Sequence, residues 1–418
     1  MIEVDKQMKG KLGDVAEIIM GQSPDSSSYN EDERGFAFLQ GCSDFGPRNP
    51  DTKIFCDQPT KVVQKDTILI SVRAPVGEIN KADKKYCIGR GLAGVVGKNI
   101  DQSYLLYWLD FGKAQLQQVS QGTTFEAINS SDLKNYQILV LPLKVQQKIG
   151  TILYTVDNLI EKTEYLIKKY QAIKQGMMHD LFTRGIETNG QLRPSYNDVP
   201  HLYKETEFGW IPRDWFSSRL GKVFDIQLGK MLSKASKTGF NSAFYLGNKN
   251  VQWNYVDLSE LEEMDFSTSE RQKYSLKYGD LLVCEGGEVG RTSMWRGEAK
   301  NVYFQKAIHR LRPCDGSVEP GYMLRFMLYA ANSGWLNNYS SQTSIAHLTQ
   351  EKLSKVPIFF PEIKEQQEIV KRFDAIDNRL YLEKKQKDKF NSIKNGLAQD
   401  LLTGRVRVPM ENDLEEVV

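Results

Sequence analysis

The chain repeats a long segment of its own sequence, and this repeat strongly limits what it can fold into. Residues 146–185 and 366–405 align without a gap at a shift of 220 positions. Identities within the alignment include Gln146/Gln366, Asp157/Asp377, Lys174/Lys394, Asp180/Asp400 and Leu181/Leu401. A weaker echo pairs residues 11–21 with residues 219–229. A repeat of this length predicts two copies of one structural unit rather than two unrelated domains.

Each copy carries the pattern of a long amphipathic helix. Apolar residues recur at steps of three and four, and no proline interrupts either segment, which is typical of one apolar stripe on a helix. About 37 residues at 1.5 Å each give a helix of roughly 55 Å. We expect the two helices to pair with each other along the stripe; the alternative is two surface helices that each cover their own domain. The predicted pairing residues are Ile149, Leu153, Val156, Ile160, Tyr170, Ile173, Met177 and Leu181 in the first helix and Ile369, Phe373, Ile376, Leu380, Phe390, Ile393, Leu397 and Leu401 in the second.

The middle of this predicted pair is less apolar in the second copy. Glu383, Lys384 and Lys387 stand where the first copy has Thr163, Glu164 and Ile167. We therefore expect a loose or hydrated contact there.

The remaining sequence predicts two globular parts of mixed structure. Short β-like runs between residues 11 and 141 are separated by Gly, Pro, Asn and Ser, with one helical stretch at 104–116, and residues 208–361 repeat that order with a helix at 322–336. The turn-rich segment 185–199 is the expected linker. The prediction is an α+β chain with two mixed α/β domains and an internal pseudo-twofold repeat. Its parts are domain 1 (1–143), long helix 1 (144–186), linker and domain 2 (187–362), long helix 2 (363–406) and an acidic tail (407–418).

Composition excludes several classes of protein. The 55 Lys and Arg residues nearly balance 53 Asp and Glu, and the globular parts are close to neutral, with 16 basic and 18 acidic residues in 1–143 and 21 and 20 in 187–362. Five scattered cysteines and four histidines offer neither a disulfide framework nor a metal site. The short apolar runs and the polar first residues predict a cytoplasmic protein without a membrane partner.

Several strings together resemble one protein family. A β-rich domain opens with LGDVAEIIMGQSP, a long helix contains QQKI and ends in MMHDLFTRG, EFGWIPRDW introduces the second domain, and the repeated helix ends in GLAQDLLTGRVRV. In order, spacing and duplication these strings resemble the DNA-specificity subunit of type I restriction-modification systems. The resemblance covers residues 11–408, although the first domain has no counterpart to EFGWIPRDW.

The resemblance implies a function in phage defence. Each globular part is expected to be a target-recognition domain that reads one half of a bipartite, asymmetric site in double-stranded DNA. The two helices are expected to pair antiparallel as a coiled coil, to set the spacing and to dock two modification (methyltransferase) subunits, with two restriction subunits joining the full complex. The chain itself is expected to be non-catalytic, so S-adenosylmethionine, ATP and magnesium are expected on the partner subunits.

Candidate DNA-binding residues follow from side-chain chemistry and loop position, because base edges are read by polar side chains on accessible loops. For each single residue an ordinary surface loop is the simpler interpretation, but the matching placement in both copies favours the loops as a set. In the first domain the candidates are Gln22, Ser23, Gln40, Arg73, Arg90, Gln121, Thr123 and Thr124. In the second they are Lys230, Lys234, Asn248, Lys249, Asn250, Arg291, Lys306, Gln342, Thr343 and Ser344.

Three other interpretations are weighed at this level. Gly89, Gly91 and Gly94 satisfy G-x-G-x-x-G, a pattern of cofactor-binding loops, yet the second copy has QKAIHR at the aligned position, so the repeat argues against a cofactor. The chain could be the recognition part of a self-contained modification enzyme with its own catalysis, which partner-free activity would reveal. It could also be a coiled-coil interaction protein that never contacts DNA, which a gel shift would reveal.

Overall fold

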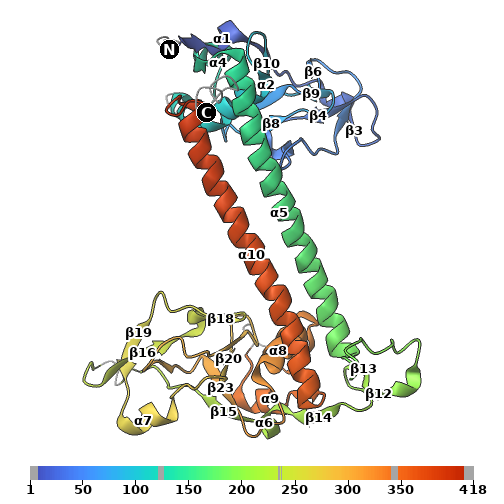
Figure 1. Cartoon of the computed structure of the whole chain (residues 1–418), viewed down its shortest axis with the longest axis vertical. Coiled ribbons are helices and arrows are strands. Elements are labelled where there is room, and N and C mark those ends of the chain that lie inside the picture. Colours follow the sequence, from blue (N-terminus) through green and yellow to red (C-terminus); the bar gives the residue numbers. More distant parts are fainter. Residues whose placement is uncertain (1–7, 121–126, 234–235, 237, 340–346, 409–418) are drawn as a thin grey trace, which may run out of the picture. The chain divides into compact units, whose positions relative to one another are not determined.

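A computed structural model describes the chain except for residues 1–7, 121–126, 234–235, 237, 340–346 and 409–418. It divides into two compact units. The first unit consists of residues 1–166 and 383–418, and the second of residues 167–382. Each unit therefore combines one globular head with one half of each long helix (Figure 1). Among the described residues, no helix has the length and apolar character needed to cross a membrane.

The first head is built mainly from short strands. A four-stranded antiparallel sheet has the order β2-β10-β7-β8, and a five-stranded sheet has the order β3-β5-β4-β9-β6, in which β4 and β9 run parallel. The elements are β1 (Met8–Lys11), α1 (Leu12–Val15), β2 (Ala16–Met20), η1 (Ser26–Ser28), β3 (Tyr29–Asn30), β4 (Phe36–Leu39), η2 (Cys42–Asp44), β5 (Phe55–Cys56), β6 (Val62–Val63), β7 (Ile68–Ser71), β8 (Ile79–Lys81), β9 (Tyr86–Ile88), β10 (Leu92–Gly97), α2 (Gln102–Phe111), α3 (Lys113–Ser120), α4 (Ser130–Asn135) and β11 (Gln137–Val140).

The four-stranded sheet of this head lies between two apolar layers, because successive side chains of a strand point to opposite faces. Ile68 and Ile70 of β7 pack toward α2 and the ends of the long helices, while Leu69 packs against the five-stranded sheet. All three side chains are fully buried. Strands buried on both faces read as continuous apolar runs, which explains the run TILISV in the sequence.

The second head has the same plan. Its four-stranded antiparallel sheet has the order β15-β23-β20-β21, and β16 pairs parallel to β22 as β4 does to β9. The elements are η3 (Pro200–Leu202), β12 (Tyr203–Thr206), β13 (Gly209–Pro212), β14 (Phe216–Arg219), α6 (Leu220–Val223), β15 (Phe224–Leu228), β16 (Ser242–Leu246), η5 (Asn248–Asn250), β17 (Val251–Gln252), β18 (Tyr255–Val256), β19 (Glu262–Asp265), α7 (Thr268–Lys273), β20 (Leu281–Cys284), β21 (Thr292–Met294), β22 (Tyr303–Phe304), β23 (Ile308–Pro313), α8 (Pro320–Asn332), η6 (Trp335–Tyr339), α9 (Gln350–Lys355) and β24 (Pro357–Phe360).

The segment that joins the first long helix to the second head is held in place by an arginine. Arg193 is 11% exposed and forms two hydrogen bonds, of 2.5 and 2.8 Å, to the carboxylate of Glu365. Asp214 accepts a third bond from the same guanidinium. Strands β12 and β13, which lie between Arg193 and Asp214 in the sequence, form a hairpin. These bonds fix the segment to the second long helix, and the turn-rich residues 185–199 connect α5 to η3, where the linker was expected.

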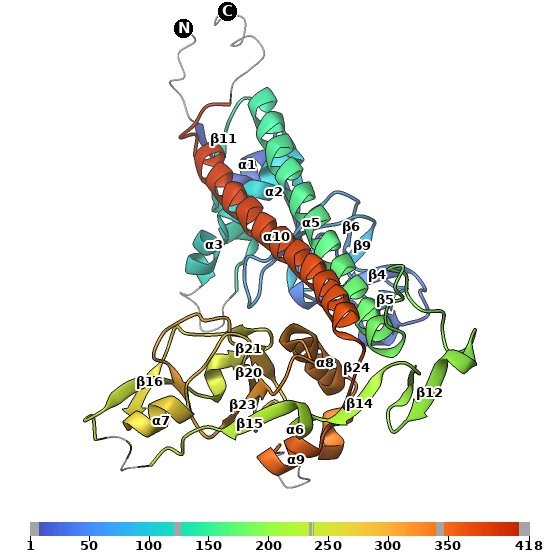
Figure 2. The same ribbon diagram turned by 60° about the horizontal axis from the view of Figure 1, so that its bottom comes forward.

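The two long helices are α5 (Leu143–Thr183) and α10 (Ile363–Leu402). In the first unit the first half of α5 lies beside the second half of α10, and in the second unit the remaining halves lie side by side (Figures 1 and 2). Matching ion pairs join them: Lys394 Nζ lies 2.8 Å from Asp157 in the first unit, and Lys174 Nζ lies 2.5 Å from Asp377 in the second. The repeat relates these pairs to each other residue by residue. The predicted antiparallel, pseudo-twofold α+β architecture is thus confirmed.

The seam between the helices differs from the prediction at two places. Ile173 and Ile393 are 43% and 38% exposed. A seam with a mean step of 3.5 residues alternates steps of three and four. The step after Tyr170 and after Phe390 is four residues, so the seam misses each isoleucine by one residue. Lys174 and Lys394 occupy the seam instead. The middle is closed rather than loose, since Thr163 and Glu383 are each 3% exposed. The other predicted pairing residues are buried or half-buried.

A buried glutamine fixes the start of each long helix to its head. In the first unit the side chain of Gln146 accepts a hydrogen bond from Asp101 N–H and donates one to the Leu141 carbonyl. In the second unit Gln366 accepts from Glu319 N–H and donates to the carbonyls of Pro361 and Ser317. The two glutamines are at most 1% exposed. This pairing explains why the repeat contains a glutamine at this position.

Candidate DNA interface

Four predicted residues of the first head gather at one corner, where β2 and β4 end and the turn between β9 and β10 begins. Ser23 Oγ accepts hydrogen bonds from Arg90 N–H at 3.2 Å and from Gln40 Nε2 at 3.5 Å. Gln22 N–H donates to the carbonyl of Ile88 and so joins this strand end to the same turn. Gln22, Gln40 and Arg90 are exposed. The corner therefore presents two amides and one guanidinium to solvent.

The second head has the same corner. Backbone bonds join the segment after β15 to the end of β22, and the strand end of β16 to Gln305, as in the first head. Lys306 occupies the position of Arg90 and is exposed. Gln305 stands where the first head has Gly89, and it forms a bridge with Lys230. The repeat therefore places one exposed cation at the same point of both heads. Gln305 was not among the predicted site residues, although the alignment of QKAIHR with the glycine pattern already sets it opposite Gly89.

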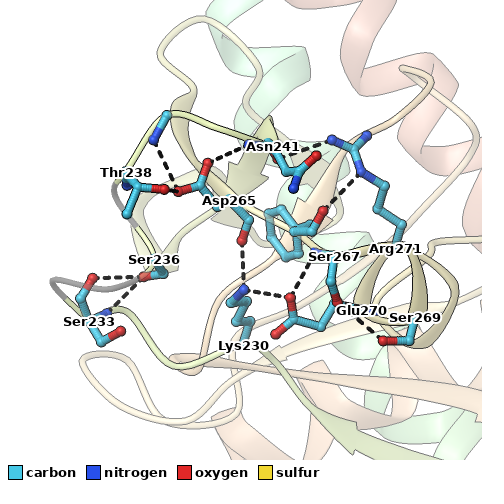
Figure 3. A network of polar contacts seen from close by, with 12 residues as sticks. Lys230, Ser233, Ser236, Thr238, Asn241, Asp265, Ser267, Ser269, Glu270 and Arg271 are labelled. Atoms are coloured by element: carbon cyan, nitrogen blue, oxygen red, sulfur yellow. Dashed lines mark hydrogen bonds and ion pairs between the residues drawn. The ribbon is translucent and has the colours of Figure 1, made fainter.

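Lys230 does not present its charge to solvent. Its ammonium donates to the Asp265 carbonyl at 2.6 Å and to Glu270 at 2.7 Å, inside the polar network of Figure 3. Asp265 in turn accepts from Thr238 Oγ1 and from three backbone N–H groups of residues 238–241. These bonds, the Thr238 hydroxyl first, lower the pKa of Asp265 to about 2. The network shapes the loop after β15, so the role of Lys230 is to hold this loop.

Arg291 and Asn250 also serve the architecture of the second head. The Arg291 guanidinium is 15% exposed, donates to the Asn248 carbonyl at 2.8 Å and lies 3.6 Å from Glu288. Asn250 is 3% exposed, and its side-chain amide bonds three backbone groups. A buried side chain with its bonds made cannot read a base edge. The prediction of base contact is therefore wrong for Asn250, and Arg291 and Lys230 are poor candidates for the same reason.

The remaining candidates divide into exposed residues and residues outside the described chain. Arg73 follows β7 and is exposed; its backbone forms a bridge with Ala127. Asn248 is half-buried, and Lys249 is exposed with Glu260 and Glu262 within 3.6 Å. Outside the described residues lie Gln121, Thr123, Thr124, Lys234, Gln342, Thr343 and Ser344.

The glycines of the G-x-G-x-x-G pattern do not form a cofactor loop. Gly94 lies inside strand β10, and the chain continues as strand to Gly97 instead of starting a helix. Gly91 is close to the backbone of Gln40, where a β-carbon would meet the Gln40 carbonyl. In the part of the chain that the structure describes, no three His, Cys, Asp or Glu side chains are grouped to hold a metal ion.

The fold and the two corners define a class of protein: a scaffold with an internal repeat, in which each of two heads presents a polar corner with one basic side chain. The family model described as "Type I restriction modification DNA specificity domain" matches residues 4–171 and 212–392. The chain therefore belongs to the type I restriction-modification DNA specificity family. It is a DNA-recognition subunit and not the catalytic one.

Curated relatives agree with this assignment, and a solved structure has a similar fold. A putative MjaX specificity subunit of Methanocaldococcus jannaschii is 41% identical over 168 residues, which is 40% of each chain. The MjaVIII specificity subunit of the same organism is 26% identical over 357 residues, or 83% of this chain and 80% of that one. The fold is similar to the S subunit from M. genitalium, with a TM-score of 0.59, 15% identity, and 96% and 98% of the two chains covered.

Proposed function

We propose that each head reads one half of a bipartite, asymmetric site in double-stranded DNA and that the paired helices set the distance between the halves. The observation that carries this proposal is the repeated corner, with Arg90 in the first head and Lys306 in the second. Guanidinium and ammonium groups are the commonest side-chain partners of guanine and of phosphate. Because the surrounding residues differ between the heads, the two half-sites should differ as well.

The nearly neutral charge of the heads supports the proposal that other subunits supply much of the attraction to DNA. Phosphate neutralisation by Lys and Arg supplies most of the non-specific affinity of DNA-binding proteins, and neither head has a large excess of these residues. The proposal therefore assigns much of the electrostatic attraction to two modification subunits docked on the helices. It also assigns S-adenosylmethionine to these subunits, and ATP and magnesium to two restriction subunits of the full cytoplasmic complex.

The test is to replace Arg90 and Lys306 separately by alanine in the complex with its modification subunits. Binding is measured on DNA with both half-sites and on DNA in which one half-site is scrambled, after the site has been read from the methylated bases of the host. Each substitution should weaken binding by about 1–3 kcal/mol if the side chain contacts a base. The loss should disappear when the half-site read by that head is scrambled.

Matched controls are Lys84→Ala in the first head and Lys300→Ala in the second, since both lysines are exposed and their loss changes the charge equally. The controls should retain the half-site preferences. An equal effect of Arg90→Ala on both half-sites would contradict reading of a half-site by that corner. Methylation by the purified chain without partners would instead favour a self-contained enzyme.

A further inference from the structure

The loop between β15 and β16 of the second head, residues 229–241, exposes large apolar side chains. Phe240 is 91% exposed, more than any other large apolar side chain among the described residues, and Met231 is 60% exposed. A single exposed apolar residue is ordinary at a protein surface, whereas apolar side chains that gather there mark a contact with a partner. The loop therefore has the surface of a binding element.

Hydrogen bonds hold the end of this loop in one conformation and join it to the candidate corner (Figure 3). The Asp265 carboxylate accepts from backbone N–H groups on both sides of Phe240, those of residues 238, 239 and 241. The carbonyl of Asp265 accepts from the ammonium of Lys230, and the Lys230 carbonyl accepts from Lys306 N–H at the corner. Because its backbone is already fixed, Phe240 loses little freedom when it binds a partner.

The charge of this loop differs between the two heads. The equivalent segment of the first head, residues 21–35, contains four acidic residues and one arginine, whereas residues 229–241 contain three lysines and no acidic residue. Strands β4 and β9 match β16 and β22, and counting back from the ends of β4 and β16 sets Glu33 opposite Phe240. DNA phosphates repel an acidic loop and attract a basic one. A basic loop with an apolar tip suits a polyanion that also offers apolar surface.

Given the DNA reading proposed above, on which this inference rests, we propose that Phe240 enters the major groove at the half-site of the second head and contacts the 5-methyl group of a thymine. The polar donors and acceptors that distinguish all four base pairs lie in the major groove, and the thymine methyl is the apolar group displayed beside them. Phenylalanine is among the side chains that make this contact. The first head has Glu33 at this position, so the contact belongs to the second half-site alone.

The test measures binding by Phe240→Ala in the complex with the modification subunits, on DNA with both half-sites and on DNA with one half-site scrambled. The variant should bind the intact site at least about tenfold more weakly than the wild type, the scale of burying one phenyl ring. The loss should disappear when one half-site is scrambled, and Lys306→Ala should act on the same half-site. Phe240 is 91% exposed, so its truncation should leave the fold intact, which thermal unfolding checks.

The second part of the test replaces the thymines of that half-site, one at a time, by deoxyuridine, which removes only the methyl group. One replacement should weaken binding by the wild type about threefold to fivefold, the scale of one buried methyl group. The same replacement should leave binding by Phe240→Ala unchanged. An equal effect of every replacement on the two proteins would overturn the thymine contact, as would an effect of Phe240→Ala on the half-site that Lys306→Ala leaves untouched.

The matched control is Tyr278→Ala, because Tyr278 is 76% exposed in the same head. It precedes the start of β20, whereas the residue after the other end of β20 bonds Ala307 beside the corner. This control should bind both half-sites like the wild type. Loss of complex assembly by Phe240→Ala in size-exclusion chromatography would mean that the loop contacts a protein and would overturn the DNA contact. A wild type without preference for intact half-sites would instead show that the proposed function itself is wrong.

Discussion

The repeated glutamines show how single side chains join a helix to a head. Gln146 and Gln366 are buried polar residues in otherwise apolar surroundings, and each bonds the cap of a head helix as well as its own helix start. The sequence alone marks them only as identities within the repeat. Their role could not be predicted, because the bonding groups belong to backbone positions 5 to 49 residues away.

Gln366→Leu should lower the free energy of unfolding of the second unit by at least about 3 kcal/mol, because three buried backbone groups would lose their partner and each unsatisfied group costs about 1–3 kcal/mol. Tryptophan fluorescence during urea unfolding measures this loss, since five of the six tryptophans lie in the second unit. Gln367→Leu is the control, because Gln367 is exposed. Similar midpoints for the two variants would mean that the buried bonds contribute little.

The long helices show what periodicity can and cannot predict. Their existence, their extent to within a few residues and most of their buried positions follow from the apolar stripe. The errors at Ile173 and Ile393 arise because apolar character is a poor guide where a lysine reaches an aspartate across the seam. Lys174 and Lys394 mark the actual course of the seam, but sequence analysis ordinarily assigns a lysine to the exposed face of a helix. Ion pairs between distant helices are visible only once the partner is placed.

The corrected seam predicts unequal effects of two similar truncations in the second unit. Leu380→Ala removes a side chain that is 8% exposed and should cost about 2–4 kcal/mol of unfolding free energy. Ile173→Ala, which truncates a side chain that is 43% exposed, should change it by less than about 0.5 kcal/mol. The urea unfolding of both variants is followed by tryptophan fluorescence. A loss for Ile173→Ala as large as that for Leu380→Ala would mean that Ile173 lies in the seam, as the apolar stripe predicts.

At the scale of the whole molecule, duplication was the most informative feature of the sequence, and the differences between the copies became informative only in the structure. The heads, the paired helices and the general location of the candidate corners were predictable. Asn250 was misassigned, and Lys230 and Arg291 became poor candidates, because loop position does not distinguish an exposed side chain from one that supports the loop.

The helices also allow a test of the proposed spacing function in the intact molecule. Inserting seven residues between Tyr165 and Leu166 of α5, and seven between Lys385 and Gln386 of α10, uses equivalent positions of the repeat. Seven residues lengthen each helix by about 10 Å and turn it by only about 20° from register, so the seam should continue across the insertion. DNA rises about 3.4 Å per base pair, and the heads should therefore select half-sites about three base pairs further apart.

The DNA site recognised by the double-insertion variant is determined by mapping methylated bases in a host that carries the modification subunits. It is determined independently by selecting bound DNA from a library with variable spacers. Both half-sites should be unchanged, and only the unread spacer should lengthen. An insertion in α5 alone is the control, because it displaces Lys174 and the residues beyond it from their partners on α10 and should abolish selection of any spacer. Retained methylation at the original spacer by the double insertion would show that helix length does not set the distance between the half-sites.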